Sequence, residues 1–222
     1  MENYMELVFL LDKSGSMGGL ENDTIGGYNS FLKKQQEEAG ATRITTVLFD
    51  NNYELLHDRL DIKAVSPITD KDYCVGGSTA LLDAIGESIH KVENVQKHSG
   101  DDYKPNKVLF VITTDGMENS SHEYTYDKVK SMVENKKEKG WEFIFLGANI
   151  DAIDVAGNFG ISSQRAANYH ADAEGLGTMF CAVSDVAVSF SLSEQSSIKD
   201  ALIEKINDEF KKREKEESCI RP

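Results

Sequence analysis

The sequence predicts an α/β protein built on a doubly wound, mostly parallel β-sheet with helices on both faces. Three short apolar runs, Leu7–Leu11, Lys107–Thr113 and Trp141–Leu146, are typical of strands buried on both sides. Amphipathic segments with helical spacing separate these runs. Strands that alternate with helices in this way are parallel and joined by right-handed crossovers, which is the basis of the prediction.

The first quarter of the chain gives one strand, one helix and a hairpin. The strand Met5–Leu11 leads through a glycine-containing loop to a helix over Leu20–Glu38. Thr42–Phe49 and Tyr53–Leu60 are rich in residues that favour strands, and an Asp-Asn-Asn turn at 50–52 separates them. A hairpin joins antiparallel strands, so one strand of the sheet must run against the others.

The remaining elements repeat the alternation. Ile62–Ser78 is irregular and delivers Thr79 to the start of a helix over Ala80–Val95. We then expect strands over Lys107–Thr113, Trp141–Leu146 and Arg165–Tyr169, the last at a sheet edge, and helices over Tyr126–Lys139, Asp151–Phe159 and Gly175–Ser191.

The chain of 222 residues is expected to form one domain over residues 1–195 and a helical extension over 196–222. Ser197 is a candidate cap for a helix whose apolar stripe packs on the domain or, alternatively, docks a partner. The charged run at 211–217 is expected to be solvated. The stripe consists of Ile198, Leu202, Ile206 and Phe210.

Composition restricts the kinds of partner and compartment. The formal charge of -14 disfavours binding to nucleic acid or to an anionic membrane. Cys74, Cys181 and Cys219 are far apart and form no C-x-x-C pair, which fits a reducing cytoplasm. No secretory signal and no stretch of about 18 apolar residues is recognised, so we expect a cytoplasmic protein.

Oxygen-bearing side chains gather where the apolar strands end. Asp12, Ser14 and Ser16 follow the first strand at alternate positions, so their side chains point the same way. Asp115 follows the strand Lys107–Thr113, and Thr79 begins a helix. In an open α/β sheet these segments meet at the switch point. Carboxylate and hydroxyl oxygens suit magnesium, calcium or manganese better than zinc.

This pattern resembles the von Willebrand factor A-type (VWA) domain with a complete metal-ion-dependent adhesion site (MIDAS). The resemblance covers about residues 5–191 and implies a six-stranded sheet with one antiparallel edge strand. It also implies Mg²⁺ or Mn²⁺, with Ca²⁺ as an alternative, held directly by the serines, by the threonine directly or through water, and by the aspartates largely through water. The residues in those positions are Asp12, Ser14, Ser16, Thr79 and Asp115.

A metal-dependent protein-interaction module is the function that follows. Neutral hydroxyls leave a divalent ion poorly neutralised, so it should attract an acidic residue of a partner protein. The chain is similar to intracellular bacterial members associated with tellurite resistance, which makes an ATPase or a stress-response protein the expected kind of partner. The oligomeric state stays open.

No enzyme activity is expected. A dehalogenase-like phosphatase needs a carboxylate where Ser14 stands, and no nucleophile elbow, dinucleotide fingerprint or phosphate loop is complete. A metal-dependent hydrolase remains the alternative. It would need a general base beside the ion, and the loop acids that are candidates for it are Asp50, Asp70, Asp72 and Glu118.

Overall fold

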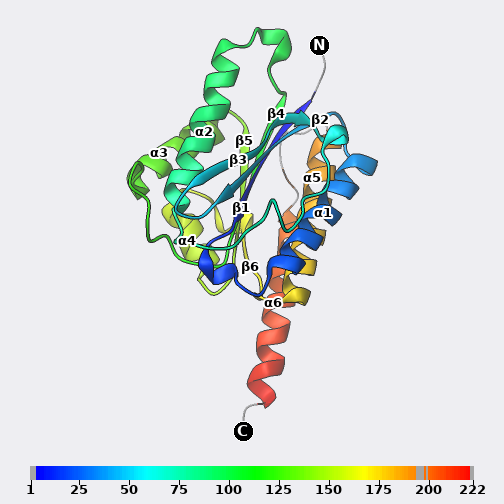
Figure 1. The fold of residues 1–222 in the computed structure, drawn as a ribbon, viewed down its shortest axis with the longest axis vertical. Helices are drawn as coiled ribbons and strands as arrows, with labels where there is room; N and C mark the ends of the chain where they lie inside the picture. Colours follow the sequence, from blue (N-terminus) through cyan, green and yellow to red (C-terminus); the bar gives the residue numbers. More distant parts are fainter. Residues whose placement is uncertain (1–3, 194–197, 199, 221–222) are drawn as a thin grey trace.

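A computed structural model describes residues 4–193, 198 and 200–220, and it contains one six-stranded sheet in the order β3-β2-β1-β4-β5-β6 (Figure 1). All neighbouring strands are parallel except β2 and β3, which form an antiparallel hairpin at one edge. The predicted fold class is therefore confirmed. The strands are β1 Met5–Asp12, β2 Thr42–Phe49, β3 Tyr53–Asp61, β4 Lys107–Thr114, β5 Trp141–Gly147 and β6 Ala166–Asn168.

Helices cover both faces of the sheet, α1, α5 and α6 on one side and α2, α3 and α4 on the other (Figure 1). The alternation along β1 divides the core, because Phe9 faces the first group and Leu10 the second. The helices are α1 Glu21–Glu38, α2 Leu81–His98, α3 Tyr126–Glu138, α4 Ala152–Asn158, α5 Ala173–Leu192 and α6 Asp200–Ile220.

The central position of β1 creates the switch point. β1 pairs with β2 on one side and with β4 on the other, and Leu11 lies opposite Thr113. The chain leaves β1 toward β2 but later returns to the other side at β4, so the loops after β1 and β4 diverge from one edge. The segments that carry Asp12 and Asp115 are thereby adjacent.

Most predicted boundaries differ from the structure by one to three residues. Helix α2 continues to His98 rather than ending at Val95, with Lys97 and His98 in the last turn where basic side chains complement the helix dipole. Helix α4 begins at Ala152 because the Asp151 carboxylate caps it, accepting hydrogen bonds from the two backbone N–H groups of residues 153 and 154.

Helix α6 lies along α5 and the edge strand β6 (Figure 1). Ile198 and Ile206 of the expected stripe are buried, as is Ile203, and Phe210 stacks on His170 with ring centroids 4.4 Å apart. Ser197 and the Leu202 side chain fall outside the described residues. Within the charged run, Arg213 departs from expectation, because it is largely buried and pairs with Asp172 at the start of α5.

Helix α5 also corrects one expectation from composition. Among the described residues, one helix, Ala173–Leu192, is long enough and apolar enough to cross a membrane, judged by length and composition alone. More than half of it is buried inside the protein, against α1, α6 and the sheet. The core helix of a water-soluble protein meets the same criteria, so this finding is weak support for a membrane span.

Candidate metal site at the ends of β1 and β4

A short 3-10 turn after β1 brings two serines together. The Ser14 backbone N–H donates to Asp12 Oδ1 at 2.7 Å, and the turn Gly15–Met17 follows with Met17 buried as its apolar anchor. This local hydrogen bond bends the chain at the strand end. The hydroxyl oxygens of Ser14 and Ser16 consequently lie 3.2 Å apart.

Two hydrogen bonds join this turn to the end of β4. Ser16 Oγ donates to Asp115 Oδ1 at 2.6 Å, and Thr114 Oγ1 donates to Asp12 Oδ2 at 2.6 Å. Both oxygens of Asp12 are therefore fixed by hydrogen bonds, one from each strand end. The parallel pairing of β1 with β4 sets the register that makes these contacts possible.

Thr79 reaches the same place from the start of α2. A Cβ atom built on Gly116 would stand 3.3 Å from Ser16 Oγ and 3.5 Å from Thr79 Oγ1, so both hydroxyls face this glycine. Asn119 fixes the position of Thr79, because its side-chain oxygen accepts the Thr79 N–H at 2.9 Å and its own N–H donates to the Thr79 carbonyl at 3.0 Å. The five predicted residues thus converge on one spot.

Burial raises the pKa of both aspartates at this site. Asp12 and Asp115 are 1% and 2% exposed, and Ser14 and Thr79 are also buried, whereas Ser16 is exposed. Burial raises the pKa of Asp12 to about 6, against the lowering effect of its hydrogen bonds, and burial also raises the pKa of Asp115. Two buried carboxylates at the ends of neighbouring strands favour a nearby positive charge.

The donor set fits a hard divalent cation. Asp115 Oδ2 is buried and has no hydrogen-bond partner among the described residues, so a carboxylate oxygen is left for another ligand. Beside it lie hydroxyl oxygens, which Mg²⁺, Mn²⁺ and Ca²⁺ accept as ligands. No group of three or more His, Cys, Asp or Glu side chains in the described part of the chain is arranged to hold a metal ion. The candidate site instead combines two carboxylates with the hydroxyls of two serines and a threonine.

Several supporting residues could not be named from sequence alone. Thr114 holds Asp12, Asn119 holds Thr79, and the buried hydroxyl of Tyr73 donates to the Asp12 carbonyl at 2.5 Å. The position of Thr114 directly before Asp115 was the available signal, since a threonine at a buried strand end needs a hydrogen-bond partner. Tyr73 and Asn119 lie in irregular loops without such a signal.

The loop acids considered as general bases mostly make local hydrogen bonds. Asp50 accepts from the backbone and side chain of Asn52, and Asp72 accepts from Thr69. Glu118 accepts from three backbone N–H groups and one hydroxyl, at Leu82, Ser120 and Ser121. These carboxylates hold turns and the start of α2.

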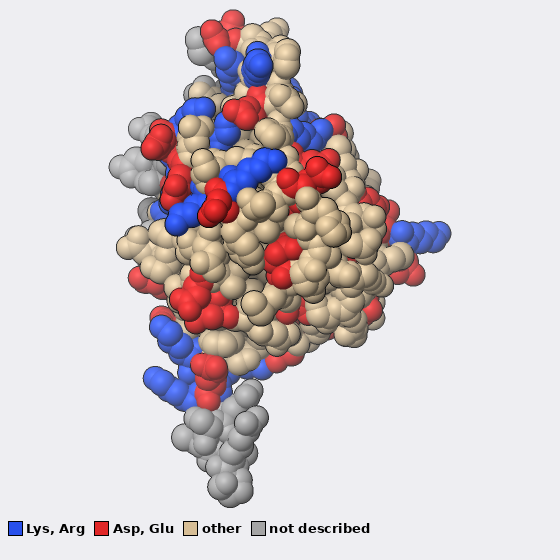
Figure 2. All heavy atoms as spheres, turned by 90° about the vertical axis from the view of Figure 1, so that its left-hand side faces the viewer, with Lys and Arg blue, Asp and Glu red and all other residues tan. Residues whose placement is uncertain are grey.

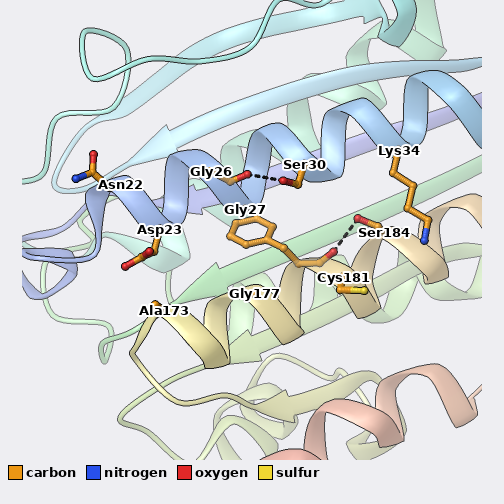
Figure 3. A pocket seen from close by; sticks show the side chains of 11 residues that line it. Asn22, Asp23, Gly26, Gly27, Ser30, Lys34, Ala173, Gly177, Cys181 and Ser184 are labelled. Atoms are coloured by element: carbon orange, nitrogen blue, oxygen red, sulfur yellow. Dashed lines mark hydrogen bonds between the residues drawn. The ribbon is translucent and has the colours of Figure 1, made fainter.

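A second concave region lies between α1 and α5 (Figure 3). This groove has a volume of about 390 Å³ and is lined by glycine, alanine and serine residues together with Asn22, Asp23, Lys34, Phe180 and Cys181. Ser30 and Ser184 in its wall donate their hydroxyl groups to carbonyls of their own helices, at 2.8 and 2.7 Å. Asp23 is the one acidic residue in this lining, so the groove lacks the carboxylate pair of the candidate metal site.

Comparison with known proteins gives matches among solved structures only. No protein-family model matches the sequence, and no curated protein matches it. The von Willebrand factor domain of the pilus tip protein Mfa5 from Porphyromonas gingivalis aligns with a TM-score of 0.61 and 12% identity, over 88% of this chain and 98% of that one.

Two further neighbours are metal-bound. Manganese-loaded TRAP protein of Plasmodium vivax aligns with a TM-score of 0.58 and 18% identity, over 80% of this chain and 72% of that one. Proximal thread matrix protein 1 from the mussel byssus, with a zinc-occupied MIDAS motif, aligns with a TM-score of 0.56 and 16% identity, over 84% of this chain and 46% of that one. The chain thus spans about half of the mussel protein. These similarities show that the chain has the fold of a von Willebrand factor A-type domain.

Proposed function

We propose that this protein is a metal-ion-dependent interaction module that binds an acidic residue of a partner protein. The observation that carries the proposal is the buried Asp115 Oδ2, which lacks a partner among the described residues and lies beside a cluster of hydroxyls. Fold neighbours that carry manganese, or zinc in a MIDAS motif, support this interpretation.

Each site residue has a defined task in the proposal. Ser14, Ser16 and Thr79 supply neutral oxygens, while Asp12 and Asp115 supply the negative charge that favours a cation. When bound, the ion supplies a positive charge that the protein ligands neutralise only in part. The exposed Ser16 marks the side from which a partner carboxylate approaches. We propose Mg²⁺ or Mn²⁺ as the resident ion.

We further propose that the site performs no chemical turnover. A hydrolytic site needs a general base within hydrogen-bond reach of an attacking water. Glu118 is used in four hydrogen bonds that hold its own loop and α2, and Asp50 in two that hold the β2–β3 turn. Screening phosphoesters, esters and peptides in the presence of Mn²⁺ tests this point.

Thermal unfolding with and without divalent ions tests the metal site. Addition of Mg²⁺ or Mn²⁺ at a hundredfold excess over its dissociation constant should stabilise the protein by about 2.7 kcal/mol. Asp115→Ala should abolish this gain. Asp185→Ala is a matched control, since Asp185 pairs with Lys34 on the α1–α5 surface. Equal stabilisation of both variants would contradict the proposed ligand set.

Affinity capture from the native host then tests the interaction. Capture of a partner should require Mg²⁺ or Mn²⁺, fail in the presence of a chelator, and fail with the double variant Ser14→Ala/Ser16→Ala. A partner that binds equally well in chelator would refute the mechanism. Replacing single acidic residues of the captured protein should identify the one carboxylate that the ion binds.

A further inference from the structure

We infer that the partner's acidic residue stands beside an apolar side chain that packs on Met117, and that it is isolated from other acidic residues. This inference rests on the proposed function and specifies the chemistry of the partner. Two independent observations carry it: the fixed exposure of Met117 beside the metal site, and the excess of acidic side chains in the surrounding loops.

Met117 is one of the most exposed large apolar side chains of the described residues. It is 65% exposed and follows directly after Asp115 and Gly116. Because Gly116 faces the hydroxyls of Ser16 and Thr79, the Met117 backbone begins at the edge of the metal site. An apolar contact is therefore available immediately beside the position proposed for the ion.

The loop around Met117 is held by hydrogen bonds on both sides. Before it, the Gly116 N–H donates to Thr114 Oγ1 at 3.2 Å. After it, Glu118 accepts the Leu82 N–H at 2.8 Å, and Asn119 makes two hydrogen bonds with Thr79. The backbone is thus fixed to β4 and α2, and the exposure of Met117 is a property of an ordered loop.

A single exposed apolar residue is common on protein surfaces and needs no explanation by itself. Met117 differs in its combination of fixed backbone and position. A thioether side chain is flexible and polarizable, so it adapts to apolar partners of varied shape. At the edge of a site that recognises only a carboxylate, such a contact adds affinity and selectivity to the ion's charge.

The charge of the surrounding loops argues against an acidic cluster in the partner. In the segments 13–21, 50–54, 65–80, 114–121 and 147–151, all within the described residues, the basic residues are Lys13 and Lys71. The Lys13 ammonium group is already paired with Glu54 at 2.6 Å and lies 4.0 Å from Asp50. The acids in these segments are more numerous: Glu21, Asp50, Glu54, Asp70, Asp72, Asp115, Glu118 and Asp151.

Acidic side chains are also widespread on the surface beyond these loops. On the face shown in Figure 2, Asp and Glu occur across the whole face, while Lys and Arg gather mainly toward its upper end and its lower left. The ion attracts a carboxylate at contact, but a second carboxylate beside it would meet loops in which acidic side chains outnumber basic ones. An apolar neighbour avoids this repulsion and covers Met117.

Peptide selection on the full-length protein tests the inference. A displayed library with a fixed central Glu and randomised flanks is selected in Mn²⁺ and eluted with a chelator. The recovered peptides should be enriched in apolar residues next to Glu and depleted in further Asp or Glu. Their affinity for Met117→Ala should be about tenfold lower, the order expected for losing most of a buried apolar side chain.

Two control variants make the result specific. Met117→Leu retains apolar area and should bind within about threefold of the wild type. Leu192→Ala removes a similarly exposed side chain, 61% exposed, at the end of α5 and should leave binding unchanged. All three variants should keep the wild-type melting temperature in Mn²⁺, because the metal ligands are intact.

The outcomes separate the two proposals. Peptides that need both Mn²⁺ and Glu, but lack an apolar neighbour or bind Met117→Ala equally well, would overturn the inference and leave the proposed function standing. Failure to recover any peptide that requires Mn²⁺ and the central Glu would overturn the proposed function and the inference with it.

Discussion

The Thr114 hydroxyl donates a hydrogen bond to Asp12 Oδ2 at 2.6 Å, although the two residues are 102 positions apart in the chain. Asp12 ends β1 and Thr114 ends β4, so this hydrogen bond lies at the point where the sheet reverses its strand order. It fixes the second oxygen of a buried carboxylate whose first oxygen accepts the Ser14 N–H. The aspartate is thereby oriented before any ligand arrives.

Replacing Thr114 with valine should lower the affinity for Mn²⁺ while the domain still folds. The variant keeps the shape of the side chain but leaves Asp12 Oδ2 without its donor, which costs about 1–3 kcal/mol of folding stability. Thr113→Val is the matched control, because Thr113 donates to the Leu10 carbonyl at 3.1 Å, away from the carboxylates. Calorimetric titration with Mn²⁺ should show weaker binding for Thr114→Val alone, and equal affinities would contradict the positioning role.

Much of this arrangement could be predicted from the sequence, because the strands are short apolar runs whose carboxyl ends are marked by Asp and Ser. The turn after Phe49 predicts an antiparallel hairpin, and the buried apolar runs predict parallel strands. Together they indicate which strand ends lie at the same edge of the sheet. The proximity of the Asp12 and Asp115 segments then follows from parallel pairing. Ser16 reaches Asp115 through the 3-10 turn Gly15–Met17, and not through the extended backbone that the alternate spacing predicts. Whether these residues hold a metal ion stays a prediction for titration to test.

The supporting contacts could not be predicted because they join loops that have no periodic pattern. Tyr73 comes from the irregular segment between β3 and α2, yet its hydroxyl lies on the backbone of Asp12. Arg213 belongs to a charged run that resembles a solvated helix face, and the packing of α6 on α5 and β6 brings it to Asp172. Such tertiary contacts override local composition.

Gly116→Ala should impair metal binding while the domain remains folded. The added methyl group would stand 3.3 Å from Ser16 Oγ, so this hydroxyl must shift by a few tenths of an ångström, whereas 3.5 Å to Thr79 Oγ1 is an ordinary contact. Gly26→Ala is the control, since its methyl group would meet nothing within 4 Å and a helix gains about 0.5–1 kcal/mol from this change. Unchanged Mn²⁺ affinity in Gly116→Ala would show that the glycine is dispensable.

The contact between Arg213 and Asp172 predicts a pH effect. The hydrogen bonds from Arg213 hold the pKa of Asp172 at about 2, below its ordinary 3.8. A lowered pKa stabilises the folded state fully above about pH 4, and this contribution disappears as the pH falls through 2. Because Asp172 is partly exposed, the contribution to stability is small.

A titration followed by carboxyl NMR shifts checks this effect. In Arg213→Met the Asp172 pKa should rise toward 3.8, although the Gly175 N–H still donates to its Oδ1 at 2.8 Å. Lys212→Met, an exposed neighbour, should leave the Asp172 titration unchanged. A pKa near 2 in both variants would mean that the helix cap, and not Arg213, sets the value.

Asn207 of α6 should be essential for order at the free edge of β6. Its side-chain oxygen accepts the Asn168 N–H at 3.2 Å and its amide donates to the Ala166 carbonyl at 3.1 Å, so one side chain pairs with the edge strand as a neighbouring strand would. Asn207→Ala leaves both groups unpaired and should cost about 1–3 kcal/mol of stability.

Hydrogen exchange at the Asn168 amide should accelerate in this variant. Asp208→Ala, at an exposed neighbour, should leave that exchange slow. Continued protection of that amide in Asn207→Ala would show that burial beneath α6, rather than this hydrogen bond, protects the edge.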